Sequence, residues 1–128
     1  MTGVQTCAFD LFVATAAVSD WKPQAISLHK EKKTDAPQNI TLVRTPDVLM
    51  TASTKVQANP KRPVLVGFAA ETHDVIAYAR GKLNRKGLDL IVANDISASG
   101  AGFGVDTNEV TFLGADGTTI AEIGRAHV

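Results

Sequence analysis

Almost wholly apolar stretches alternate along the chain with stretches in which apolar residues recur every three or four positions. The apolar runs at 10–18, 63–67 and 88–93 predict strands that are buried on both faces. Segment 39–43 alternates polar and apolar residues, which predicts a strand with one exposed face. Pro23 prevents the first strand from continuing as a central strand, because proline donates no ladder hydrogen bond.

Two helices are predicted between these strands. The first starts with Thr45 as N-cap and Pro46 in the first helical position, carries a stripe of apolar residues, and ends before Pro60. The second runs from His73 to about residue 86 and ends at Gly87, where a left-handed residue is expected. Segment 68–72 is interpreted as a loop with a capping threonine before this helix.

The last third of the chain predicts a hairpin. Segments 109–113 and 118–121 are strand-like and flank the turn-rich segment 114–117, while 97–104 is a glycine-rich loop. Strands alternating with amphipathic helices are typical of an α/β fold. We therefore expect a mostly parallel sheet with a C-terminal antiparallel hairpin.

Composition limits the chain to one domain and excludes several classes of protein. The 128 residues have a net charge of zero and one cysteine, so we expect neither a disulfide framework nor a thiolate metal cluster. A reducing compartment, the cytoplasm, is the expected location. The apolar run at 11–18 is far shorter than the roughly 20 residues that cross a membrane, so we expect no membrane partner.

Both ends of the chain resemble translated sequencing adapters, at residues 2–8 and 122–128. We therefore expect residues 1–8 and 122–128 to be foreign and the domain to span residues 9–121 as a piece of a larger enzyme.

Charge is unevenly distributed despite the zero sum. Residues 22–86 carry a net charge of +7, and residues from 87 onward carry −5. Lys82 and Lys86 are four residues apart, so they lie on one helix face and could reach the same anion. A solvated basic face is the more common explanation of such a pattern. Few aromatic residues are interleaved with the basic ones, so nucleic acid is not an expected partner.

Candidate chemistry lies where the predicted parallel strands end, because ligands of open α/β sheets bind there. The segments at these positions are Ser19–Asp20, 68–72 and Asn94–Asp95; all three carry polar groups, and Phe68 adds an aromatic ring. Any one of these carboxylates could be only a cap or a turn former. No dinucleotide or P-loop fingerprint is present, which disfavours a nicotinamide-dependent oxidoreductase. The residues alone indicate an α/β domain that binds a small anion or a nucleotide.

Several motifs together resemble the phosphopantothenoylcysteine synthetase family, from about residue 10 to 121. In order, the matching segments are 14–23 (ATAAVSDWKP), 30–33 (KEKK), 44–48 (RTPDV), 67–72 (GFAAET), 88–97 (LDLIVANDIS) and 102–106 (GFGVD). The resemblance implies an incomplete Rossmann-like three-layer fold. In bacteria this synthetase is usually the C-terminal half of a bifunctional coenzyme A biosynthesis protein, whose decarboxylase half carries FMN.

The resemblance implies a ligase that joins 4′-phosphopantothenate to cysteine, using CTP and Mg²⁺ through an acyl-cytidylate, and that forms a homodimer or a higher oligomer. The residues expected to contact CTP are Ala14, Thr15, Ala16, Asp20, Lys30, Pro46, Asp47, Val48, Leu49, Phe68, Lys82 and Lys86. Lys30 is the expected catalytic residue, and Asp20 is a candidate Mg²⁺ ligand. Asp47 could instead serve only to stabilise its helix.

This chain departs from the family pattern at three positions, Lys22, Glu31 and Thr45. It also lacks the family's N-terminal glycine-rich segment, so we expect the chain alone to be inactive. The alternative is a nucleotide-binding or dimerisation module that catalyses no reaction.

Overall fold

The computed structural model describes residues 10–33, 35–97 and 107–125. Five strands form the main sheet in the order β1-β4-β5-β6-β7: β1 (Leu11–Val13), β4 (Val64–Glu71), β5 (Leu90–Asp95), β6 (Thr107–Gly114) and β7 (Thr119–Arg125). The pairings β1–β4 and β4–β5 are parallel, and β6 and β7 add an antiparallel hairpin. The predicted α/β class and the C-terminal hairpin are confirmed. β7 pairs with β6 as far as Arg125, within the segment 122–128 that is expected to be foreign to the domain.

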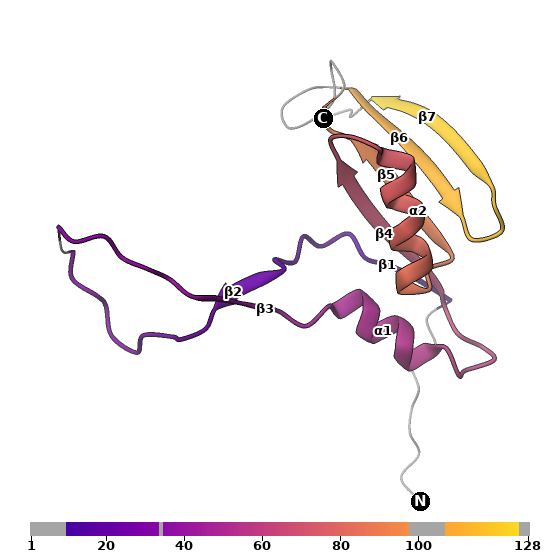
Figure 1. Ribbon diagram of the computed structural model, residues 1–128. Helices are drawn as coiled ribbons and strands as arrows, with labels where there is room; N and C mark the ends of the chain where they lie inside the picture. Colours follow the sequence, from indigo (N-terminus) through magenta and orange to yellow (C-terminus); the bar gives the residue numbers. More distant parts are fainter. Residues whose placement is uncertain (1–9, 34, 98–106, 126–128) are drawn as a thin grey trace, which may run out of the picture.

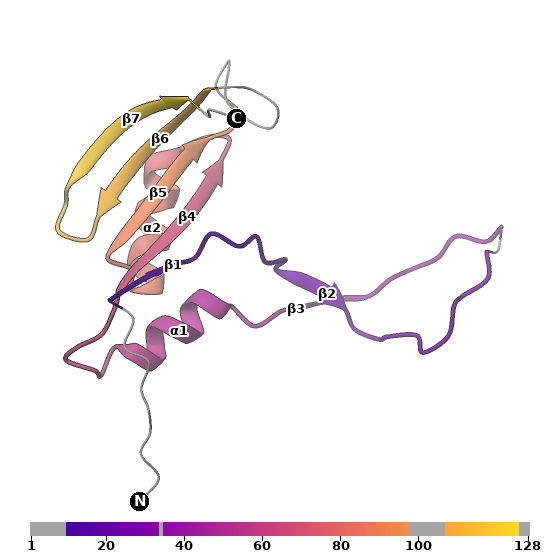
Figure 2. The ribbon, with the colours of Figure 1, turned by 180° about the vertical axis from the view of Figure 1, so that it is seen from behind.

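The two helices, α1 (Val48–Val56) and α2 (Val75–Lys86), lie on the same face of the sheet. Leu65, Ala69, Ile91 and Leu113 point to this face from the strands and form a buried core with Ala79, Leu83 and Leu88. Figure 2 shows the opposite face with no helix over it, and Leu11, Val13, Val64 and Ile120 remain exposed there. The described residues thus form two layers of the expected three.

The first strand differs from its prediction. The run 10–18 was expected to be a long strand buried on both faces, but β1 has only three residues, and Leu11 is 56% exposed. β1 pairs only with β4 and lies at the edge of the described sheet. An apolar run therefore indicated a strand correctly, but its burial depends on neighbours that the run itself does not specify.

A second, two-stranded sheet projects from the body of the molecule (Figure 1). β2 (Trp21–Pro23) pairs antiparallel with β3 (Leu42–Arg44), and a long loop joins them. The strand predicted at 39–43 thus lies at Leu42–Arg44, a few residues closer to α1 in the sequence. Pro23 lies at the end of this ribbon and in no central strand, as expected.

Helix α1 begins later than predicted. Its N-cap is Asp47, whose carboxylate accepts a hydrogen bond from the Met50 amide at 2.9 Å. Thr45 was expected to cap the helix, but its amide bonds to the Asp20 carbonyl and its hydroxyl to the Ser19 carbonyl. Thr45 therefore fastens the preceding loop. The helix ends at the C-cap Gln57, before Pro60 as predicted.

Segment 68–72 was predicted to be a loop, and this prediction is wrong. β4 continues to Glu71 because it pairs with β5 as far as Asp95. Thr72 does not cap α2, since the N-cap is Asp74 at φ 46°, without a side-chain cap. Gly87 at the other end has φ 60°, which confirms the predicted left-handed residue.

Neither helix among the described residues is long and apolar enough to span a membrane.

Candidate functional site

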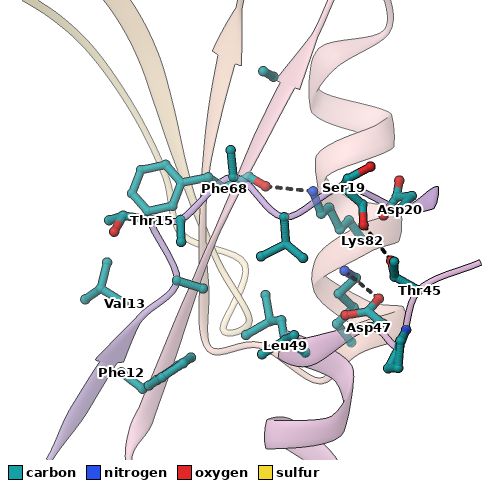
Figure 3. A pocket seen from close by; sticks show the side chains of 18 residues that line it. Phe12, Val13, Thr15, Ser19, Asp20, Thr45, Asp47, Leu49, Phe68 and Lys82 are labelled. Atoms are coloured by element: carbon teal, nitrogen blue, oxygen red, sulfur yellow. Dashed lines mark hydrogen bonds and ion pairs between the residues drawn. The ribbon is translucent and has the colours of Figure 1, made fainter. Parts of the chain in front are cut away.

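A pocket of about 610 Å³ lies beside the end of β1, between the loop 14–20 that follows β1, the start of α1, strand β4 and helix α2 (Figure 3). Eleven of the twelve residues expected to contact a nucleotide line it: Ala14, Thr15, Ala16, Asp20, Pro46, Asp47, Val48, Leu49, Phe68, Lys82 and Lys86. Segments that are distant in sequence are thus brought to one place.

The loop 14–20 is fastened at both ends. The Ala14 amide bonds to the Val66 carbonyl at 2.9 Å, which continues the β1–β4 pairing for one residue. At the other end, the Thr45 hydroxyl donates to the Ser19 carbonyl, and the Thr45 amide donates to Asp20. These bonds position a short stretch of small residues along the wall of the pocket, where backbone groups can contact a ligand closely.

Close packing brings α1 to the pocket. Gly67 lies in β4 opposite α1, and a Cβ added there would come within 2.7 Å of a Leu88 methyl and 3.1 Å of a Leu49 methyl. Leu49 is itself part of the pocket wall. Glycine at position 67 therefore allows the start of α1 to approach the sheet, which directs the positive end of the helix dipole toward the pocket.

Lys82 extends from α2 to the middle of β4. Its ammonium donates to the Phe68 carbonyl at 2.7 Å, and the side chain is partly buried. Burial is the largest cause that lowers the pKa of Lys82 below its ordinary value, and the positive charge of Lys86 is the next. The negative charges of Glu71, Asp20 and Asp47 offset part of this decrease. An anion in the pocket would supply the negative charge that favours the charged form of this lysine.

Lys86 forms an ion pair with Asp47 at 2.7 Å, and its side chain is only 14% exposed. Desolvation is the largest single influence on Asp47 and raises its pKa. Hydrogen bonds from Lys86 and from the Met50 amide, with the charges of Lys86 and Lys82, outweigh it, so the pKa of Asp47 is lowered overall. Asp47 is therefore a carboxylate and combines the helix-stabilising role that was considered for it with a contact to the pocket.

The pocket has two chemically different ends. Figure 3 shows the Phe68 ring at one end and the Lys82 and Asp47 side chains at the other. Phe68 is 41% exposed, which leaves its ring available to a ligand. An aromatic surface at one end and ammonium groups at the other suit a ligand that has a flat ring and an anionic group.

Of the twelve residues expected to contact the nucleotide, Lys30 is the one that does not line the pocket. It lies in the loop between β2 and β3, which extends away from the sheet (Figure 1). Asn94 and Asp95, expected near the site from their place after a predicted strand, do not line the pocket either. Asp95 instead accepts hydrogen bonds from the amide and hydroxyl of Ser97.

Seven further residues line the pocket, of which Ser19 and Ala70 belong to the candidate segments Ser19–Asp20 and 68–72: Phe12, Val13, Ala17, Val18, Ser19, Thr45 and Ala70. Within 68–72, the two-residue period of a strand would have singled out Ala70, because Phe68 and Ala70 lie on the same face of β4. Because 68–72 was predicted to be a loop, the two-residue period of a strand was not applied to it. No group of three or more metal-ligating side chains occurs among the residues that the structure describes, and Asp20 remains a single candidate ligand.

The chain is similar to a known protein family and to curated proteins of coenzyme A biosynthesis. Residues 2–126 match the family described as DNA/pantothenate metabolism flavoprotein C-terminal domain. The coenzyme A biosynthesis bifunctional protein CoaBC of Bacillus subtilis is 51% identical over 110 residues, which cover 86% of this chain and 26% of that protein. CoaBC of Vibrio parahaemolyticus is 44% identical and covers 88% of this chain and 28% of its own length. The chain thus spans about a quarter of the length of these curated relatives.

Two solved structures resemble the chain in fold. The C-terminal domain of a CoaBC protein matches with a TM-score of 0.60 and 34% identity, over 88% of this chain and 44% of that domain. The DNA/pantothenate metabolism flavoprotein from Streptococcus pneumoniae matches with a TM-score of 0.64 at 23% identity, over 92% of this chain and 57% of the other, which supports the fold alone.

Proposed function

The chain belongs to the DNA/pantothenate metabolism flavoprotein C-terminal domain family, and we propose that it forms the nucleotide-binding part of a CTP-dependent phosphopantothenate–cysteine ligase. The observation that supports this most is the two-ended pocket, with Phe68 at one end and Lys82 and Asp47 at the other (Figure 3), where Lys86 pairs with Asp47. The relatives that match are named as bifunctional coenzyme A biosynthesis proteins, and such a ligase has a place in that biosynthesis.

The proposed reaction has two steps. The carboxylate of 4′-phosphopantothenate attacks the α-phosphorus of CTP and pyrophosphate leaves, forming an acyl-cytidylate. The amine of cysteine then attacks the acyl carbon, CMP leaves, and the amine loses a proton. Activation is required because a free carboxylate has no adequate leaving group. The first step transfers a highly charged group, so the pocket contributes mainly by orienting it and by stabilising negative charge.

Each end of the pocket has a role in this proposal. The Phe68 ring and the backbone of loop 14–20 hold the cytosine. Lys82 and Lys86, with the start of α1, hold the triphosphate and stabilise charge that develops as pyrophosphate leaves. Lys82 already donates a hydrogen bond to a strand carbonyl, which keeps its ammonium at the pocket before the ligand arrives.

Mg²⁺ fits this arrangement as an ion that binds with the nucleotide. Magnesium usually uses one or two carboxylates together with phosphate oxygens and water. Asp20 lines the pocket and is the carboxylate that we propose for it. When bound, the ion would neutralise phosphate charge, while the protein residues orient the nucleotide.

Lys30 is proposed as the residue that acts on the acyl-cytidylate, although it lies on the projecting loop. It can reach a pocket if the loop moves or if a second copy of the chain supplies it. We therefore include a homodimer or a higher oligomer in the proposal. In the full-length protein, Lys30→Gln should reduce turnover strongly and leave CTP binding within about threefold, and unchanged turnover would remove Lys30 from the site.

Calorimetric titration of the full-length protein with CTP and Mg²⁺, compared with ATP and Mg²⁺, tests the proposed function. We expect CTP to bind more tightly, and Lys82→Gln to weaken CTP binding at least about tenfold, because hydrogen bonds between charged groups are strong. Lys55→Gln is the matched control, since Lys55 lies on α1 outside the pocket lining. Equal binding of both nucleotides, or none by folded protein, would overturn the proposal. CTP binding without ligation of the two substrates would favour the alternative of a binding module.

A further inference from the structure

Asp47 uses its two carboxylate oxygens for two different helices. Oδ1 accepts the hydrogen bond from the Met50 amide at 2.9 Å and so caps α1. Oδ2 lies 2.7 Å from the Lys86 Nζ, at the last turn of α2. One side chain therefore links the start of α1 to the end of α2, and both ends border the pocket.

The Lys86 ammonium needs a partner to stay where it is. Its side chain is 14% exposed, and an unpaired ammonium in such a place is unfavourable. Lys82 lies one turn earlier on the same helix, and the influence of each lysine's charge on the other is repulsive. A lysine side chain is also long and flexible. The contact with Asp47 thus determines where this ammonium lies.

A direct contact between Asp47 and a triphosphate is unfavourable, because both are negatively charged. One oxygen is already occupied by the helix cap, and the other by Lys86. Lysine has three N–H donors, so Lys86 can keep its bond to Asp47 and still donate to a phosphate oxygen.

We propose that Asp47 is a positioning residue that holds the Lys86 ammonium at the pocket, ready for the triphosphate, and does not itself bind the nucleotide. This inference rests on the proposed function and adds the residue that orders one of its two phosphate-binding lysines.

Asp47→Asn separates the two roles of the side chain. Asparagine caps helices about as well as aspartate, because its amide oxygen can accept the same backbone hydrogen bond. It carries no charge to hold Lys86. In the full-length protein, we expect this variant to stay folded with α1 still capped, to lose some thermal stability because Lys86 loses its charged partner, and to bind CTP about tenfold more weakly. Tighter CTP binding would overturn the proposal, because it would mean that the carboxylate opposes the triphosphate.

A double-mutant cycle tests whether Asp47 acts through Lys86. We expect Asp47→Asn to change CTP affinity less than about twofold when Lys86→Gln is already present, because coupled residues are not additive. The same tenfold loss in both backgrounds would overturn the proposal. Asp116→Asn is the control, since Asp116 is an exposed residue of the hairpin turn outside the pocket lining.

A measurement without nucleotide keeps this inference distinct from the proposed function. An amine-acylating reagent, read by mass spectrometry, should modify Lys86 slowly in the wild-type protein and several-fold faster in Asp47→Asn, with exposed Lys55 unchanged in both. Wild-type protein that does not bind CTP would overturn the proposed function. Unchanged acylation of Lys86 in Asp47→Asn would overturn the positioning role, whether or not CTP binds.

Discussion

The body of the molecule and its projecting arm are built differently. The body consists of the five-stranded sheet with α1 and α2, and it buries Leu65, Ile91 and Leu113 almost completely. The arm, residues 21–44, consists of β2, β3 and the loop between them, and it leaves Ile26 88% and Leu28 91% exposed. The body is stabilised by its own core. The shape of the arm depends much less on contacts within the chain, yet the arm carries Lys30.

Core truncation should give the largest contrast between the two regions. Ile91→Ala creates a cavity in the body and should lower the free energy of unfolding by about 2–5 kcal/mol. Leu28→Ala in the arm should change it by less than about 0.5 kcal/mol. Urea denaturation of both variants checks this. A large loss for Leu28→Ala would show that the arm is packed in solution against something outside the contacts of this chain.

The ion pair at the base of the body should give the next largest effect. Asp89 accepts two hydrogen bonds from Arg62, at 2.6 and 2.8 Å, and one from the Leu65 amide. Asp89→Asn should lower the free energy of unfolding by about 1–2 kcal/mol, a value reduced for the partial exposure of the pair. Asp35→Asn in the arm is the control and should have almost no effect.

The Asp89 effect should also depend on pH. The hydrogen bond from Arg62, chiefly, lowers the pKa of Asp89 in the folded protein. Its stabilisation is therefore fully present above the ordinary aspartate pKa of about 3.9 and is lost as pH falls below that value. The difference between wild type and Asp89→Asn should be largest near neutral pH and shrink on acidification. A difference that stays constant below pH 4 would contradict this account.

Two glycines, Gly81 inside α2 and Gly87 at its C-terminal end, should respond to substitution in opposite directions. Gly87 has φ +60°, and a Cβ there would also lie 2.7 Å from the Gln57 side-chain nitrogen, so Gly87→Ala should cost about 1 kcal/mol. Gly81 lies inside α2 with no atom within 4 Å of an added Cβ. Gly81→Ala should therefore stabilise by about 0.5–1 kcal/mol. Thermal unfolding followed by circular dichroism measures both, and shifts of the same sign would contradict the prediction.

The smallest effect should come from the arm itself. Trp21 is the only tryptophan in the chain, and the Arg44 guanidinium lies 5.2 Å from its ring centre. Arg44→Ala removes a contact that contributes about 0.5–1 kcal/mol at an exposed site. It should shift Trp21 fluorescence and leave the unfolding of the body, followed by circular dichroism, unchanged. A change in both signals would show that the arm and the body unfold together.

The same contrast explains what could be predicted from the sequence. Body elements carry their own signals: the apolar periods of α2 and β5, the left-handed Gly87, and the hairpin between β6 and β7 were all found. Errors occurred where long-range pairing decides the outcome. β4 continues past Gly67 because β5 pairs with it, and β1 is exposed because it lies at the edge of the described sheet. Thr45 looked like a cap but bonds to the Ser19 carbonyl, far away in sequence.

In the candidate site, too, what depends on long-range contacts could not be predicted from the sequence. The resemblance to the synthetase family indicated eleven residues that the fold brings to one pocket. The distance in space between these residues and Lys30 could not be read from the sequence, since the arm has few contacts to fix its direction. The pairing of Asp47 with Lys86 was also not predicted, because it depends on how α1 and α2 meet.

A crystal structure of the full-length protein with CTP and Mg²⁺ tests the central claim most directly. The account predicts the cytosine against Phe68 and phosphate oxygens within hydrogen-bonding distance of the Lys82 and Lys86 ammonium groups. It also predicts that Lys86 keeps its contact with Asp47. Nucleotide bound at another place, with Lys82 and Lys86 free of contact to it, would contradict the account.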